Sequence, residues 1–89
     1  MNKNWLFENV RVLRDDFTFA DASVAVRDGV IAEIGRPDGA GLQKIDGAGR
    51  LLVPGLIDTH FHGALGNCFG RTGPEGIREV AAFEAQQGV

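Results

Sequence analysis

The sequence predicts a mainly β N-terminal part followed by one short strand and one helix. Short runs of apolar and β-branched residues alternate with turn residues through the first half of the chain. A Pro-Gly pair at 54–55 interrupts this pattern, and an amphipathic stretch at 74–87 has the spacing of a helix. We therefore divide the chain into residues 1–53, a small sheet module, and residues 54–89, a β/α unit.

Length and composition limit the classes of function. The chain has 89 residues, which makes it at most one small domain, and its net charge of −3 offers no basic patch for nucleic acid and no polybasic membrane anchor. The N-terminus does not read as a signal peptide, and no run approaches the ~20 apolar residues of a membrane helix. One cysteine, Cys68, excludes an internal disulfide, so we expect a reducing, cytoplasmic location.

The start of the chain predicts two extended pieces. Residues 5–13 carry apolar and β-branched side chains with polar interruptions, which favours a strand over a helix. Asp15 and Asp16 end this run. Phe17 and Phe19 then alternate with a threonine, which predicts a second, short extended piece.

A hairpin is the clearest local prediction. Residues 24–27 and 30–34 are apolar runs on either side of Asp28-Gly29. An Asp-Gly pair between such runs favours a two-residue turn because both turn residues must accept a positive φ. The stretch 35–41 is dense in glycine and proline without periodicity, and it predicts an exposed loop.

Two further short strands are predicted at 44–46 and 50–53, on either side of the Gly-Ala-Gly segment 47–49. Together with the preceding pieces they predict a small antiparallel sheet over roughly residues 4–53. No catalytic constellation occurs in this stretch, so we expect its role to be structural.

The second half predicts a helix over 74–87. Thr72 and Glu75 fit a capping box, with proline tolerated in the first turn, and Gly88 supplies the stop. One side of this helix carries the apolar residues Ile77, Val80 and Phe83. We expect this side to cover the preceding strand.

Both histidines of the chain follow the Pro-Gly break. In a strand over 56–61 successive side chains point to opposite faces, so Asp58, His60 and His62 share one face. Imidazole nitrogens are common ligands of zinc and other divalent metals, and a carboxylate beside them could orient a ring or complete the shell. His60 and His62 are therefore the candidate metal ligands, although a His-x-His pair on its own is more often a pair of surface or core histidines.

The segment 54–63, PGLIDTHFHG, resembles the first metal-binding strand of the amidohydrolase superfamily. Residues 63–89 look like the N-acetylglucosamine-6-phosphate deacetylase branch. The resemblance implies an α/β parent fold, a metal-dependent (β/α)8 barrel with a flanking β-sandwich. Residues 1–53 would be part of the sandwich and residues 54–89 the first strand and helix of the barrel. A complete barrel needs ~250 residues, so this chain holds only its beginning.

The resemblance also implies a chemistry. The parent would deacetylate N-acetylglucosamine 6-phosphate to glucosamine 6-phosphate and acetate, with His60 and His62 binding zinc or iron, one or two ions per complete site. Its general-base aspartate and remaining ligands would come from later strands, so we expect no catalytic residue and no activity in this chain alone. The implied partner is a small amino-sugar phosphate, and the complete protein is expected to be a homodimer.

Alternatives remain open. The Pro-Gly-x-Ile-Asp-x-His-x-His pattern is shared by dihydroorotase or hydantoinase-like, imidazolonepropionase-like and deaminase branches. The stretch 67–69, Asn-Cys-Phe, departs from the acidic residue expected near these glycines. The glycines of the loop 63–73 could cradle a phosphate or simply make a flexible loop. An alternative of another class is a non-enzymatic β-rich module that pairs its open edges with itself or with another chain.

Overall fold

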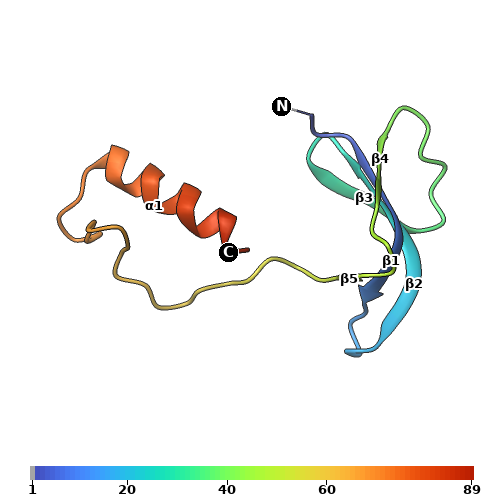
Figure 1. The fold of residues 1–89 in the computed structure, drawn as a ribbon, viewed down its shortest axis with the longest axis horizontal. Helices are drawn as coiled ribbons and strands as arrows, with labels where there is room; N and C mark the ends of the chain where they lie inside the picture. Colours follow the sequence, from blue (N-terminus) through green and yellow to red (C-terminus); the bar gives the residue numbers. More distant parts are fainter. Residues whose placement is uncertain (1) are drawn as a thin grey trace. The chain divides into compact units, whose positions relative to one another are not determined.

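The computed structural model describes residues 2–89, which contain five strands and one helix joined by turns and loops (Figure 1). The chain divides into a sheet unit, Met1–Val53, and a helix unit, Pro54–Val89. This boundary coincides with the Pro-Gly break, and the assignment of the two units to a sandwich and a barrel stays a prediction. In chain order the elements are β1 (Trp5–Leu13), β2 (Phe19–Arg27), β3 (Val30–Gly35), β4 (Gln43–Asp46), β5 (Leu51–Leu52) and α1 (Pro74–Gln86).

The predicted hairpin is confirmed. β2 and β3 pair antiparallel, and the two residues between them, Asp28 and Gly29, have φ of 54° and 79°. Two positive φ values define the turn type that matches the twist of hairpin strands. The strand predicted at 5–13 is also confirmed as β1, which pairs antiparallel with β2.

The prediction that Phe17 belongs to an extended piece is wrong. Phe17 has a φ of 63°, is 83% exposed, and donates its N–H to the Arg14 carbonyl at 2.9 Å. The Asp16 carboxylate accepts the Thr18 N–H at 3.0 Å and the Thr18 hydroxyl at 2.6 Å, and these bonds hold a turn. β2 therefore starts only at Phe19 and runs without a break to its end.

The sheet is mixed rather than antiparallel, because β4 and β5 both pair parallel to β1. The strand order is β3-β2-β1-β4, with β5 also on β1. Since β3 occupies the free edge of β2, the chain reaches the other edge of the sheet only through the crossover loop 36–42. A crossover returns the chain to the end where β1 began, so β4 runs in the same direction as β1.

Both faces of the sheet bury side chains. Leu6 and Ala25 are buried cross-strand partners on one face, where a side-chain Cβ at Gly39 of the crossover loop would lie 2.6 Å from Leu6. Val10 and Val24 are buried on the other face. The crossover loop thus lies against one face, and the φ of 66° at Gly39 favours glycine at this close approach.

The helix of the second unit agrees with its predicted range to within a residue and ends as expected. Gly88 has a φ of 92°, and its N–H donates to the Ala85 carbonyl at 3.2 Å. The Val89 N–H donates to the Glu84 carbonyl at 3.1 Å, so the two bonds form a Schellman motif. Within the described residues, no helix has the length and apolar character needed to cross a membrane.

The predicted capping box is wrong. The N-cap is Gly73, without a side-chain hydrogen bond, and the Thr72 hydroxyl instead donates to the Asn67 side-chain oxygen at 3.0 Å. A Cβ at Gly76 would overlap the Thr72 hydroxyl. The glycine therefore lets the preceding loop pack closely on the first turn of the helix.

The strand predicted at 56–61 does not form. This stretch has no regular structure, with a bend at Thr59 and His60, and Ile57 is 87% exposed. A strand needs a neighbour for its backbone groups, and the Leu56 N–H instead donates to the Gly88 carbonyl at 2.7 Å. Of the predicted apolar side of α1, only Val80 is fully buried.

Candidate metal site

The two imidazoles converge although the strand that predicted their convergence is absent. The Nε2 atoms of His60 and His62 lie 2.9 Å apart, with ring centroids at 4.8 Å and planes at 70°. Zn–N bonds are ~2.0–2.1 Å long, so two nitrogens bound to one ion are at most ~4.2 Å apart. The observed distance is that of a hydrogen bond between the two rings, with one nitrogen donating to the other. It is somewhat shorter than the ~3.3 Å between two nitrogens of a tetrahedral zinc shell, and metal binding by these residues stays a prediction.

Asp58 takes another role than the one considered from the sequence. Its carboxylate oxygen Oδ1 accepts the backbone N–H of His60 at 3.1 Å, which forms a turn at the bend. This hydrogen bond joins Asp58 to the backbone of His60 and not to an imidazole ring. The structure therefore supports Asp58 as a turn residue ahead of the histidine pair rather than as a third ligand.

A packed loop follows the pair. The Asn67 N–H donates to the Ala64 carbonyl at 2.8 Å, and Leu65 and Gly66 between them have φ of 55° and 79°, which makes a tight two-residue turn. A Cβ at Gly63, whose φ is 138°, would overlap the Asn67 carbonyl oxygen. The glycines of this loop thus allow close backbone packing.

Phe69 is the residue of this site that sequence reasoning missed. Its N–H donates to the His62 carbonyl at 2.9 Å, and its ring meets Phe61 edge to face, with centroids 5.4 Å apart and planes at 77°. Two phenylalanines around a glycine-rich turn are the only signal in the sequence for this contact. The contact between Phe61 and Phe69 forms only when the loop folds back.

The described residues bring together two candidate metal ligands, His60 and His62. Within residues 2–89 no group of three His, Cys, Asp or Glu side chains could hold a metal ion. Cys68 is a free, exposed thiol in the same loop. Two ligands leave most of a coordination shell to be filled from elsewhere.

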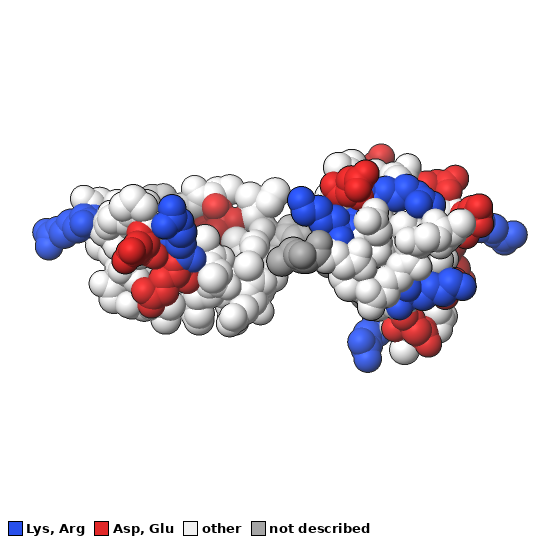
Figure 2. Space-filling model, turned by 90° about the horizontal axis from the view of Figure 1, so that it is seen from above, with Lys and Arg blue, Asp and Glu red and all other residues white. Residues whose placement is uncertain are grey.

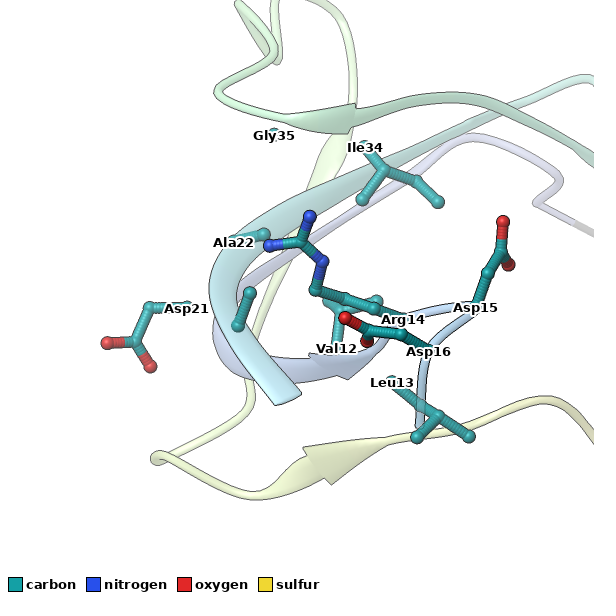
Figure 3. Close-up of a pocket in the computed structure, with 10 residues that line it drawn as sticks. Val12, Leu13, Arg14, Asp15, Asp16, Asp21, Ala22, Ile34 and Gly35 are labelled. Atoms are coloured by element: carbon teal, nitrogen blue, oxygen red, sulfur yellow. The ribbon is translucent and has the colours of Figure 1, made fainter. Parts of the chain in front are cut away.

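A hollow in the sheet unit is a separate feature (Figure 3). It is lined by the ends of β1 and β2, the turn between them and the end of β3, and its walls include Arg14, Asp15 and Asp16. Hydrogen bonds from the Thr18 hydroxyl and amide hold the pKa of Asp16 below its ordinary value. This carboxylate therefore caps a turn and does not act as a neutral acid at pH 7.

Charges are mixed on the face seen in Figure 2, where acidic and basic side chains alternate over the sheet unit. That face shows no continuous basic area of the kind that binds nucleic acid.

No protein-family model matches the chain. Over 63 residues it is 46% identical to dihydropyrimidinase from Rattus norvegicus, covering 64% of this chain and 12% of that protein. Over 60 residues it is 40% identical to dihydroorotase from Bacillus cytotoxicus, covering 66% and 14%. Over 42 residues it is 50% identical to adenine deaminase from Bacillus pumilus, covering 47% and 7%. These relatives are amidohydrolases.

All three relatives are hydrolases that act on C–N bonds, in agreement with the predicted class. The chain spans 12% and 14% of the length of the first two. Their names favour the dihydroorotase or hydantoinase-like alternative over the deacetylase branch. A solved structure from Bacillus thuringiensis matches 72% of this chain and 99% of its own at 24% identity, but its TM-score of 0.47 is too low to define a shared fold.

Proposed function

We propose that this chain is the N-terminal portion of a metal-dependent amidohydrolase of the dihydroorotase and dihydropyrimidinase kind, with a cyclic amide as its substrate class. The observation that carries the proposal is the 2.9 Å separation of the His60 and His62 nitrogens. The identities of 46% and 40% to enzymes of these names support the choice of branch.

In this proposal His60 and His62 hold a divalent metal, zinc or iron, through their unprotonated Nε2 atoms. When bound, such a metal lowers the pKa of a water toward neutrality and polarises the amide carbonyl. The remaining ligands and the general base come from outside the described residues, which hold no third ligand beside the pair. The contribution of this chain is to present two imidazoles at a spacing that one ion can bridge.

The finer prediction from the sequence, an N-acetylglucosamine-6-phosphate deacetylase, takes second place. It depends on the pattern of residues 63–89 alone, and none of the three relatives described above has that name. A cytoplasmic location remains part of the proposal, because Cys68 is a free thiol.

Zinc titration of the 89-residue chain tests the metal site. By calorimetry we expect His60→Ala and His62→Ala each to weaken zinc binding by at least about tenfold, because each removes one ligand of the pair. Cys68→Ala is the matched control, since a free thiol in the same loop could bind zinc by itself. Unchanged affinity in both histidine variants would show that the pair is not a metal site.

A further inference from the structure

Two hydrogen bonds fix the backbone on either side of the histidine pair. Before it, the Asp58 carboxylate accepts the His60 N–H at 3.1 Å. After it, the His62 carbonyl accepts the Phe69 N–H at 2.9 Å. Each histidine therefore has one backbone group tied to a residue outside the pair.

Phe61, the residue between the two histidines, is also held by a contact outside the pair. The Phe61 ring meets the Phe69 ring edge to face at 5.4 Å. This contact fixes the side chain of the residue that separates the two imidazoles. The same residue, Phe69, thus makes both a backbone bond to His62 and a ring contact to Phe61.

We propose that Asp58 and Phe69 are positioning residues that hold the two imidazoles converged before a metal arrives. This inference rests on the proposed function in one respect, the metal binding by His60 and His62. Ligands locked by their own supporting contacts lose less conformational freedom on binding than ligands on a mobile segment. Asp58 and Phe69 then affect metal affinity without contacting the ion.

Conservative variants separate positioning from a general effect on folding. Asp58→Asn keeps a side-chain oxygen that can accept the His60 N–H, whereas Asp58→Ala removes it. Phe69→Tyr keeps an aromatic ring against Phe61, whereas Phe69→Ala removes it. The far-ultraviolet circular dichroism of α1 reports whether each variant keeps its helix. If Phe69→Ala loses that signal, Phe69→Leu replaces it, since leucine keeps apolar bulk without the ring.

The first measurement needs no metal. In the wild-type chain we expect nuclear Overhauser effects between the imidazole protons of His60 and His62, because their nitrogens are 2.9 Å apart. Asp58→Asn and Phe69→Tyr should keep these signals, and Asp58→Ala and Phe69→Ala should lose them. Signals that persist in both alanine variants would overturn the positioning role.

The second measurement is zinc titration of the same variants. We expect Asp58→Ala and Phe69→Ala to bind zinc roughly 10-fold to 100-fold more weakly, as supporting residues of metal ligands commonly do. Full affinity in both would refute the positioning role while leaving the metal site intact. A wild-type chain that shows the ring contacts but binds no zinc would refute the proposed function and still support the positioning.

Discussion

Asp46 ties the loop between β4 and β5 to the irregular part of β1. Its carboxylate accepts the Ala48 N–H at 2.8 Å and the Asn9 side-chain amide at 3.2 Å. These two bonds, with a smaller contribution from Arg50, hold the pKa of Asp46 below its ordinary value of 3.8. Because the folded pKa is the lower one, the ionised carboxylate stabilises the fold above the unfolded pKa, and this stabilisation is lost as pH falls through the folded pKa.

We therefore expect Asp46→Ala to lower the thermal midpoint of the sheet unit at about pH 7, with a smaller difference from wild type at about pH 2, because the carboxyl takes up a proton as the pH falls. The fluorescence of Trp5, the only tryptophan, reports unfolding of β1. Asp38→Ala, in the exposed part of the crossover loop, is the matched control. A midpoint difference that stays constant between the two pH values would contradict the role given to this carboxylate.

Single residues show which backbone features a sequence predicts. The turn at Asp28 and Gly29 was predictable because that residue pair accepts positive φ without outside help. Ala48 also has a positive φ, 52°, but alanine gives no such signal. Its conformation depends on Asp46 and on the register of β1, so only the folded sheet reveals it.

At the scale of elements, the sequence predicted single strands and helices better than it predicted which strands pair. β1, the hairpin and the range of α1 follow from patterns within one segment. The parallel pairing of β4 and the failure of residues 56–61 to form a strand depend on which edges are free and on which neighbours exist. Neither condition is encoded in the alternation of a short apolar run.

The helix of the second unit offers a test of its packing. Val80 is 1% exposed, whereas Ile77 on the same helix is 46% exposed. We expect Val80→Ala to destabilise the helix unit by about 2 kcal/mol through lost burial, reduced by a few tenths because alanine favours a helix. Ile77→Ala, which removes more atoms from a half-exposed site, should cost less. Thermal unfolding followed by helical circular dichroism measures both, and equal losses would place Val80 outside the core.

At the scale of the whole molecule, the sequence predicted the convergence of His60 and His62 from a strand that does not form. The rings still meet, because Asp58 and Phe69 shape the segment in another way. The spacing of the two histidines in the sequence was enough to identify them as candidate metal ligands. Their supporting contacts involve a loop that folds back on itself, and no periodic pattern describes that fold.

The same geometry predicts that the 89-residue chain does not catalyse hydrolysis. Within the described residues no third His, Cys, Asp or Glu side chain joins the pair in a group that could hold a metal ion, so a bound metal would be held weakly. With added zinc we expect no turnover of dihydroorotate and no acetate release from N-acetylglucosamine 6-phosphate. His60→Ala separates a true activity from a contaminating enzyme, because only the former depends on this imidazole. Turnover that disappears in that variant would mean that two ligands suffice, or that a second copy of the chain completes the site.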